Sequence, residues 1–203
     1  MPPEPTVFVV DDDPAVRQSF KWLVGSIGLK VQTFSCAQDF IRDYDPADSG
    51  CLVVDVRMPG MSGIELQEKL ANDGISIPII VVTAYGDVPT AVRAMKRGAM
   101  DFIEKPYNDQ AMLDRIQLCI ERDAKMRREK EIRREVTWRA ERLTPREREV
   151  FELIVAGRSN KEVARALDIS PKTVEAHRAK VMDKMAVGSL AELVQLSTYL
   201  ELD

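Results

Sequence analysis

The sequence predicts two folded parts: an α/β domain with a doubly wound, five-stranded parallel sheet, and an all-α domain of four helices with a helix-turn-helix. Short apolar runs alternate with amphipathic helical segments from residue 1 to about 120, which is typical of a parallel sheet. Roughly the last sixty residues carry no strand signal. At 203 residues the chain is long enough for two domains. We expect an α/β domain over 1–122, a helical linker over 123–142 and a helical domain over 143–203.

Five apolar runs are predicted to be the strands of the sheet. They are Val7–Val10, Val31–Phe34, Cys51–Val54, Ile79–Thr83 and Asp101–Glu104. The helices between them have recognisable start signals, which are a capping residue followed by Pro, or Ser followed three residues later by Glu or Gln. These signals are Asp13 before Pro14, Ser35 before Gln38, Ser62 before Glu65, and Asp87 ahead of Pro89.

A further helix begins near Asp109 and leads into a run of charged residues after Arg122. Such a run is usually a solvated helix or a linker. The first part has a predicted buried face, and the second part keeps a thin apolar stripe that would allow helix pairing in a dimer. The sequence leaves open whether the helix continues to near Arg134. The buried face is Leu113, Ile116 and Ile120, and the stripe is Ile132, Val136 and Ala140.

The C-terminal part contains four short helical patterns with clear caps. Thr144-Pro145-Arg146-Glu147 and Ser159-Asn160-Lys161-Glu162 are capping boxes, Ser170-Pro171 starts a third helix, and Ser189 and Glu192 start a fourth. Gly157 and the turn at Asp168-Ile169 separate the first three. A helix, a turn and a second helix within a small helical domain is an architecture typical of DNA binding.

Composition and charge distribution narrow the class of protein. No apolar stretch is long enough to span a membrane, and the first residues lack the pattern of a signal peptide, so we expect a cytosolic protein. Residues 1–122 contain 12 basic and 18 acidic residues, and the remainder contains 17 and 15, which suggests different partners for the two parts. The three cysteines show no metal-binding spacing and are interpreted as buried thiols, with redox sensing as the alternative.

Carboxylates follow two of the predicted strands directly. Val7–Val10 is followed by Asp11-Asp12-Asp13, and Cys51–Val54 is followed by Asp55. Adjacent parallel strands would bring these side chains to one edge of the sheet, where α/β folds place their sites. Because clustered carboxylates repel one another, the pattern indicates a hard cation such as Mg²⁺, and one carboxylate is a candidate phosphoryl acceptor.

Seven motifs together resemble a two-component response regulator of the FixJ/NarL type, in which a CheY-like receiver precedes a LuxR-type helix-turn-helix domain. The resemblance covers nearly the whole chain. In the receiver part it rests on residues 9–13 (VVDDD), 55–63 (DVRMPGMSG), 81–84 (VVTA) and 102–106 (FIEKP). In the second part it rests on residues 143–150 (LTPREREV), 159–164 (SNKEVA) and 170–178 (SPKTVEAHR).

The resemblance implies roles for the residues that match the receiver motifs. Asp55 is the phosphorylated aspartate, and Thr83 and Lys105 contact the phosphoryl group. Phe102 is the aromatic switch, and the Lys105-Pro106 bond is expected to be cis. The Mg²⁺ ligands would be Asp11, Asp12, Asp55 and the backbone carbonyl of Arg57.

The resemblance also implies how phosphorylation would act. A sensor histidine kinase would supply the phosphoryl group, since His177, the single histidine here, lies in the other domain. The segment Val88–Tyr107 would change shape and form a homodimer, with Val92, Met95, Lys96 and Asp101 on the dimer face. Tyr85 stands where close relatives commonly carry His. It is interpreted either as a shield of the phosphoryl group against water or as a solvent-facing loop side chain.

Within the second domain, residues Pro171–Met185 are the expected recognition helix. A helical wheel directs Val174, Val181 and Met185 into the core and leaves an opposite face for the DNA major groove. His177 is expected to have a structural or phosphate-contacting role rather than to bind a metal. In the last helix, Leu190, Leu193, Val194 and Leu200 are expected in the core or partly in a dimer interface. The candidate DNA contacts are Asn160, Lys161, Lys172, Thr173, Glu175, Ala176, His177, Arg178, Ala179 and Lys180.

The predicted function is therefore regulation of transcription at promoter DNA, with RNA polymerase as a further partner, and not enzymatic turnover of a substrate. A receiver does promote its own phosphorylation and dephosphorylation. A phosphatase with an aspartyl-phosphate intermediate is disfavoured, because those of the haloacid-dehalogenase type carry a second Asp where this chain has Arg57. A DNA-binding protein with a purely structural receiver and a small-molecule sensor are weaker alternatives. The kinase, the signal, the promoters and the sign of regulation cannot be read from the sequence.

Overall fold

The computed structural model describes residues 4–200, and the chain divides into two compact units. The first unit extends to Met126 and the second begins at Arg127. The first unit therefore ends four residues after the predicted end of the α/β domain. None of the helices among the described residues is both long enough and apolar enough to cross a membrane.

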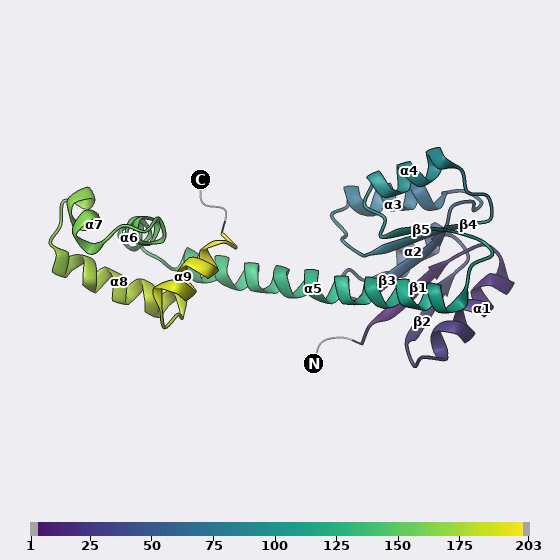
Figure 1. Ribbon diagram of the computed structural model, residues 1–203, viewed down its shortest axis with the longest axis horizontal. Helices are drawn as coiled ribbons and strands as arrows, with labels where there is room; N and C mark the ends of the chain where they lie inside the picture. The colour runs from purple at the N-terminus through teal and green to yellow at the C-terminus, as the bar shows by residue number, and fades with distance from the viewer. Residues whose placement is uncertain (1–3, 201–203) are drawn as a thin grey trace. The chain divides into compact units, whose positions relative to one another are not determined.

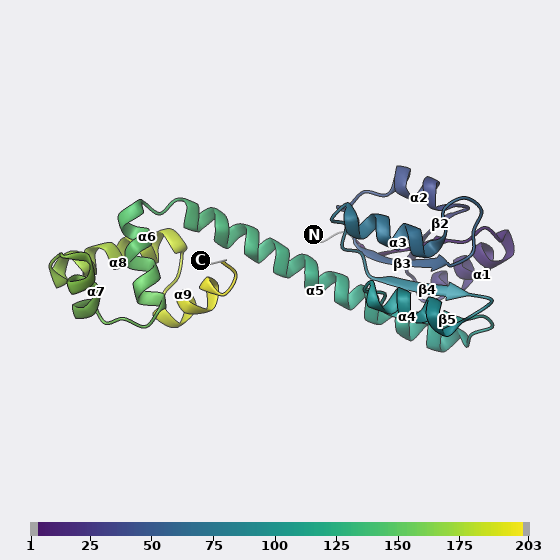
Figure 2. The same cartoon turned by 90° about the horizontal axis from the view of Figure 1, so that it is seen from above.

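The first unit contains a five-stranded sheet in the order β2-β1-β3-β4-β5, with all neighbouring strands parallel (Figures 1 and 2). This confirms the predicted doubly wound α/β fold. The strands β1, β3 and β4 are buried along their whole length, which explains why they read as continuous apolar runs in the sequence. The strand bounds are β1 (Thr6–Val10), β2 (Lys30–Phe34), β3 (Gly50–Asp55), β4 (Ile79–Thr83) and β5 (Asp101–Glu104).

Helices cover both faces of this sheet. One apolar cluster joins a face of the sheet to α1 (Pro14–Gly25) and to the first part of α5 (Asp109–Glu141). The other cluster joins the opposite face to α2 (Ala37–Asp43), α3 (Gly63–Asn72) and α4 (Val88–Lys96). Burial of these two apolar layers is the main source of stability for the first unit.

Most of the predicted helix starts in the first unit are confirmed, and one is wrong. Asp13, Ser62 and Asp87 each accept a hydrogen bond from the backbone of the first turn, and Ser62 forms a complete capping box with Glu65. The N-cap of α2 is Cys36 and makes no side-chain cap bond. Ser35 lies one residue earlier and its hydroxyl donates to the Asp39 carboxylate at 3.4 Å instead.

A single helix, α5, runs without interruption from Asp109 to Glu141, which answers the question of continuity that the sequence left open (Figure 2). Its first part belongs to the first unit, where Met112, Ile116 and Ile120 are buried. The predicted residue Leu113 is only partly buried, because Met112 takes the place expected for it. Its last part belongs to the core of the second unit, to which it contributes Val136 and Ala140.

Asp123 fastens α5 to the start of β3. Its Oδ2 accepts hydrogen bonds from the Ser49 hydroxyl and from the Gly50 N–H, both at 2.9 Å. Gly50 has a φ of +146°, and a Cβ there would lie 1.8 Å from the Thr6 carbonyl oxygen. A larger residue at position 50 is therefore excluded. The buried carboxylate of Asp123 ties the end of the first unit to its sheet.

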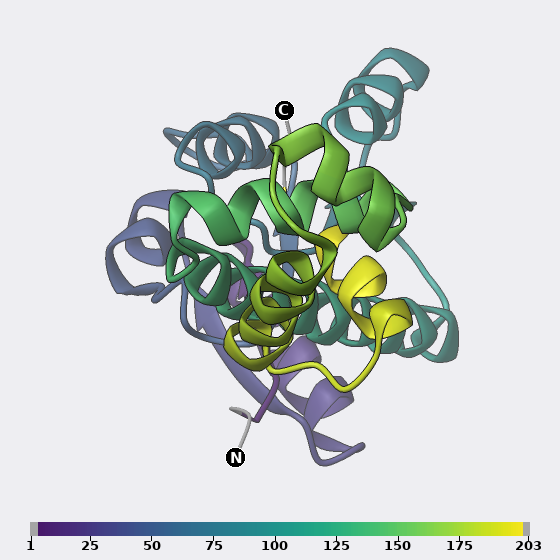
Figure 3. The same cartoon turned by 90° about the vertical axis from the view of Figure 1, so that its left-hand side faces the viewer.

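The second unit contains four short helices packed around the end of α5 (Figure 3, green to yellow). Capping boxes at Thr144 and Ser159 and caps at Ser170 and Ser189 are present as predicted. Gly157 follows the first of these helices with a φ of +81°, a conformation that glycine adopts without strain. The helices are α6 (Pro145–Val155), α7 (Asn160–Leu167), α8 (Pro171–Met185) and α9 (Leu190–Ser197).

The core of the second unit agrees with the prediction for α8, and in α9 only part of the predicted stripe lies in the core. Val174, Val181 and Met185 are fully buried, as the helical wheel predicted. In α9 Leu193 is fully buried and Leu200, beyond its end, packs against the core, but Leu190 and Val194 are each 40% exposed. Helix α9 spans only Leu190–Ser197, and the buried residues on it, Leu193 and Ser197, are one turn apart.

Candidate functional site

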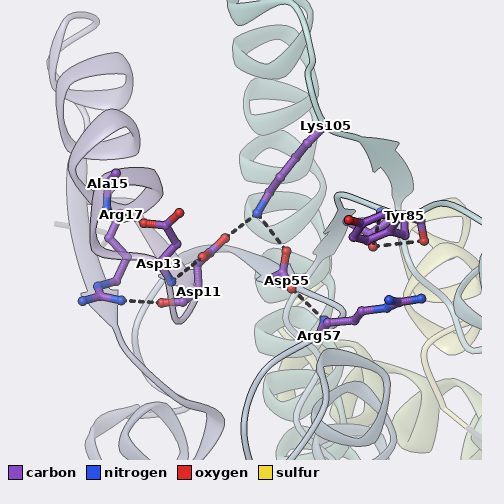
Figure 4. Close-up of polar contacts among 9 residues, drawn as sticks. Asp11, Asp13, Ala15, Arg17, Asp55, Arg57, Tyr85 and Lys105 are labelled. Atoms are coloured by element: carbon purple, nitrogen blue, oxygen red, sulfur yellow. Dashed lines mark hydrogen bonds and ion pairs between the residues drawn. The ribbon is translucent and has the colours of Figure 1, made fainter.

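Three strand ends bring Asp11, Asp55 and Lys105 together at the carboxyl edge of the sheet (Figure 4). The Lys105 ammonium donates to Asp11 Oδ2 at 2.7 Å and to Asp55 Oδ1 at 2.8 Å. The side chains of Asp11 and Asp55 are 4% and 9% exposed. The peptide bond between Lys105 and Pro106 is cis, as predicted. These side chains come from positions far apart in the sequence, and the parallel register of β1, β3, β4 and β5 determines how close they lie.

The single Lys105 ammonium compensates only part of the negative charge of the two buried carboxylates. Burial raises the pKa of Asp11, although the hydrogen bond from Lys105 works against this shift. Burial alone would lower the pKa of Lys105, but its hydrogen bonds with Asp11 and Asp55 outweigh burial and leave the pKa above its usual value. With both aspartates ionised, these three side chains carry a net charge of about −1.

Backbone N–H groups hold the two carboxylates in place, and a nearby arginine holds the backbone of Asp11. The Asp13 N–H donates to Asp11 Oδ1 at 2.9 Å, and the Arg57 N–H donates to Asp55 Oδ2 at 2.6 Å. The Arg17 guanidinium donates to the Asp11 carbonyl at 2.7 Å. Because these bonds use only some of the oxygen lone pairs, each carboxylate keeps acceptor capacity for a further ligand.

The donor set fits Mg²⁺ in its chemistry, with two buried carboxylates and an uncompensated negative charge. The structure does not bring all the predicted Mg²⁺ ligands together. Asp12 is exposed, and among residues 4–200 no three His, Cys, Asp or Glu side chains form a group that could hold a metal. The structure thus brings Asp11 and Asp55 together and leaves Asp12 apart from them.

Thr83 lies at the end of β4, one position beyond the residue that pairs with Asp55, and is 1% exposed. Its hydroxyl is bonded to its own loop: it accepts from the Tyr85 N–H at 3.2 Å and donates to the Tyr85 carbonyl at 3.3 Å. Phe102 on β5 is partly buried against the apolar cluster beneath α4. The predicted switch residues therefore lie on adjacent strands, and Thr83 faces its own loop.

Tyr85 stacks with Arg57 beside the acidic pair. The Arg57 guanidinium carbon lies 4.9 Å from the centre of the Tyr85 ring, and the Tyr85 side chain is 68% exposed. Figure 4 shows Arg57 and Tyr85 on one side of Asp55, with Asp11 on the other. The sequence did not indicate this contact, because it joins two loops that follow different strands.

The predicted dimer face on α4 presents apolar side chains to solvent. Val92 and Met95 are 45% and 47% exposed, and Lys96 beside them is exposed as well. Asp101 is partly buried, and its carboxylate pairs with Arg115 on α5 at 2.9 Å. Asp101 is therefore already engaged within the first unit.

In the second unit, one face of α8 is exposed while the opposite face forms the core. Val174 and Val181 are buried on the core side. His177 and Arg178 lie at the edge and are partly buried. Lys161 at the start of α7 is exposed, and Asn160 before it is partly buried. The exposed candidates on α8 are Lys172, Thr173, Glu175, Ala176, Ala179 and Lys180.

A side-chain bond joins the two helices of the helix-turn-helix. Arg178 Nη1 donates to Asn160 Oδ1 at 3.0 Å, which leaves the Asn160 side-chain nitrogen as a donor for a further partner. The sequence predicts these two residues as separate DNA contacts. Their hydrogen bond was not predicted, because α7 and α8 come into contact only when the chain folds. The pairing fixes Arg178 between the helices.

Two protein families match this chain. Residues 7–117 match the response regulator receiver domain, and residues 141–197 match the bacterial regulatory proteins of the luxR family. The matched segments fall in the two parts of the chain that hold the acidic cluster and the exposed face of α8.

Curated relatives and solved structures are similar over almost the full length. The transcriptional regulatory protein FixJ of Azorhizobium caulinodans is 47% identical over 197 residues, covering 97% of this chain and 93% of the relative. Nodulation protein W of Bradyrhizobium diazoefficiens is 44% identical, covering 94% of this chain and 84% of the relative. The structure of the response regulator StyR is 46% identical with a TM-score of 0.85, covering 97% of this chain and 100% of that chain. Full-length FixJ from B. japonicum is 42% identical with a TM-score of 0.59, covering 97% of each chain.

Proposed function

Because the chain belongs to the response regulators that join a receiver domain to a LuxR-type DNA-binding domain, we propose that phosphorylation of Asp55 controls promoter binding by the second unit. The protein is a transcription regulator of a two-component system. The observation that carries the proposal is the pair of buried carboxylates bridged by Lys105 at the edge of the sheet. A buried negative charge that one lysine does not compensate is typical of a reactive site.

The chemical step is transfer of a phosphoryl group from a phosphohistidine on a sensor kinase. An Asp55 carboxylate oxygen attacks phosphorus, the phosphorus–nitrogen bond of the donor breaks, and its electron pair returns to the histidine ring. Lys105 already lies 2.8 Å from Asp55 and offsets charge on the transferred group. Thr83 would donate its hydroxyl to the phosphoryl oxygens after leaving the Tyr85 carbonyl.

We propose that Mg²⁺ is held by Asp11, Asp12, Asp55 and the Arg57 carbonyl. The bound ion would supply electrostatic stabilisation of the phosphoryl oxygens in the transition state. Asp12, which is exposed, would have to turn toward the other two aspartates. The raised pKa of Asp11, which burial causes, supports the assignment, because a bound cation would stabilise the ionised form of this buried carboxylate.

Phosphorylation would then change the segment from α4 to β5 and favour a homodimer. Thr83 moves toward the phosphate, and Phe102 turns into the space that it leaves. The exposed Val92 and Met95, together with Lys96 and Asp101, would form the dimer face. Two chains held together would present two DNA-binding units to two half-sites.

In the second unit we propose that α8 enters the major groove. Glu175 would accept from a cytosine amino group, while Ala176 and Ala179 let the helix approach the bases closely. The remaining polar residues would contact phosphates and set the position of the helix. They are Asn160, Lys161, Lys172, Thr173, His177, Arg178 and Lys180.

The proposed organisation is a receiver over 1–122, a helical linker over 123–142 and a DNA-binding domain over 143–203. Asp123 would hold the first residue of the linker on the receiver. A kinase as phosphodonor and promoter DNA as ligand favour the cytoplasm as the place of action. RNA polymerase is a further proposed partner at the promoter.

Tyr85 is proposed to shield the phosphoryl group on Asp55 from water. The support is its stacking on Arg57, whose backbone N–H contacts the Asp55 carboxylate. A cation over an aromatic ring holds both side chains in one arrangement.

Phosphorylation by acetyl phosphate with Mg²⁺ tests the proposed function. The parent chain should gain one phosphoryl group, form a dimer on a sizing column and bind promoter DNA more tightly. Asp55→Asn should show none of these changes while keeping the parent's circular dichroism. A parent chain that gains no phosphoryl group, or an Asp55→Asn chain that still gains one, would contradict the proposal.

A further inference from the structure

The loop of residues 84–86, between the end of β4 and the N-cap of α4, is held by three neighbouring side chains. Thr83 exchanges two hydrogen bonds with the backbone of Tyr85. Arg57 stacks on the Tyr85 ring (Figure 4). The third contact comes from Glu104, the last residue of β5.

Glu104 reaches this loop because of its register. It pairs with Thr83 across β4 and β5, and its Oε1 accepts a hydrogen bond from the Gly86 N–H at 3.2 Å. Position 86 admits this approach because glycine has no Cβ. A Cβ there would lie 3.2 Å from the Glu104 carboxyl carbon, closer than most such contacts, so one group would have to give way.

Glu104 also lies on the same side of the sheet as the predicted switch residue. Phe102 and Glu104 are two residues apart on β5, so their side chains point to the same face. Phe102 packs against the apolar cluster beneath α4. A rotation of Phe102 and a movement of the 84–86 loop would therefore both take place next to Glu104.

We propose that Glu104 is a positioning residue that holds the 84–86 loop in its unphosphorylated arrangement through the Gly86 N–H. This inference rests on the proposed phosphorylation of Asp55. The Thr83 hydroxyl has a single proton, so it must give up its bond to the Tyr85 carbonyl before it can donate to a phosphoryl group, and this weakens its hold on the loop. The Glu104 carboxylate and the phosphoryl oxygens both accept hydrogen bonds from N–H groups of the loop. Because they lie in different places, each acceptor favours a different position of the loop.

The expected effect is modest because the Glu104–Gly86 bond is exposed to solvent. Loss of the acceptor in Glu104→Ala should raise the rate of phosphorylation by acetyl phosphate, and the fraction of dimer at a fixed dose, by about threefold to fivefold. Glu104→Gln keeps an acceptor oxygen within reach of the Gly86 N–H, so it should stay close to the parent.

Gly86→Ala offers an independent way to break the same contact. Its new methyl group would displace the Glu104 carboxylate by a few tenths of an ångström and lengthen the 3.2 Å bond, so it should raise the rate in the same direction as Glu104→Ala but by less. The double variant should then show no more than the larger single effect, since both changes remove one interaction. In nuclear magnetic resonance spectra, the Gly86 amide signal of Glu104→Ala should shift toward its position in the phosphorylated parent.

The experiment uses full-length parent, Glu104→Ala, Glu104→Gln, Gly86→Ala and the double variant, with equal melting temperatures as the check on folding. If the parent is phosphorylated and Glu104→Ala reacts no faster, the positioning role is wrong. Equal rates for Glu104→Gln and Glu104→Ala would also overturn it, because charge rather than the hydrogen bond would then be responsible. A parent chain that is not phosphorylated at all would instead contradict the proposed function.

Discussion

The two units each contain a buried carboxylate bonded to a lysine, and the two arrangements have opposite electrostatics. In the first unit, two aspartates share Lys105, and burial raises the pKa of Asp11. In the second unit, Glu147 has Lys184 to itself at 2.6 Å and also accepts the Thr144 N–H of its capping box at 2.9 Å. The bonds from Lys184 and Thr144 lower the pKa of Glu147 to about 2.

The difference in charge balance distinguishes the candidate site in the first unit from the structural ion pair in the second. Lys184 also donates to the Arg142 carbonyl, so it joins the end of α5 to α6 and α8. Every charge in that arrangement has a partner, which favours stability. The acidic pair of the first unit keeps excess negative charge and free lone pairs, which costs stability and leaves room for a ligand. We therefore expect substitution of the carboxylates to change stability in opposite directions in the two units.

The largest expected effect is the loss of Glu147. Glu147→Ala removes both the ion pair and half of a capping box, and should destabilise the second unit by about 3 kcal/mol. Hydrogen exchange of second-unit peptides in the full chain measures this change. Glu149→Ala is the matched control, since its pair with Arg146 is much more exposed and should contribute less than about 1 kcal/mol. Equal effects of the two variants would refute the special role of Glu147.

A fall in pH should destabilise the second unit through protonation of the same residue, Glu147. The pKa of Glu147 in the folded state is about 2, below its ordinary value of 4.5, so its contribution is fully present above about pH 4.5. That contribution, roughly 3 kcal/mol at most, should be lost as the pH falls from about 4.5 to 2. Stability followed by hydrogen exchange or denaturant titration across this range checks it. A Glu147→Gln chain should lose less stability over the same interval, and an identical loss would contradict the assignment.

The ionisation of Asp11 should change the stability of the first unit in the opposite direction as the pH falls. Its pKa in the folded state is raised, so its ionised form is disfavoured by folding, and stability should increase as the pH falls through that pKa. Asp11→Asn should accordingly stabilise the first unit by about 1 kcal/mol at neutral pH while reducing phosphorylation. Hydrogen exchange of first-unit peptides measures the gain. A clear loss of stability would mean that the acidic pair is a structural contact like Glu147 and Lys184.

The smallest expected effect concerns Tyr85. Tyr85→His removes an exposed stack on Arg57 that is worth about 0.5–1 kcal/mol, so the lifetime of the phosphorylated chain should fall by roughly twofold to fivefold. Loss of the phosphoryl group with time, followed by mass spectrometry, gives this lifetime. Equal lifetimes of variant and parent would leave Tyr85 as an ordinary loop side chain.

Local signals in the sequence predicted most of the fold. The buried strands are short runs of apolar residues, and the cap residues at Ser62, Thr144 and Ser159 act within a few positions along the chain. The prediction for Ser35 failed because tertiary contacts start α2 one residue later, at Cys36. Leu113 was placed in the core ahead of Met112 because spacing alone does not fix the rotation of a helix against its sheet.

The candidate site was predicted in its residue types and only partly in its contacts. The positions of Asp11, Asp55, Thr83 and Lys105 follow from strand ends and family motifs. The sequence did not indicate that Lys105 bridges both aspartates, or that Thr83 is bonded to its own loop. Pairs such as Glu104 with Gly86 and Arg178 with Asn160 join residues about 18 positions apart on different elements, and only the packed fold brings them together.

The most direct test of the account is to measure promoter affinity and phosphoryl content on the same sample after treatment with acetyl phosphate and Mg²⁺. We expect one phosphoryl group on Asp55 and a rise in affinity that follows the phosphorylated fraction. Asp55→Asn should show neither change. A chain that carries the group on Asp55 but binds promoter DNA no more tightly than before would contradict the account.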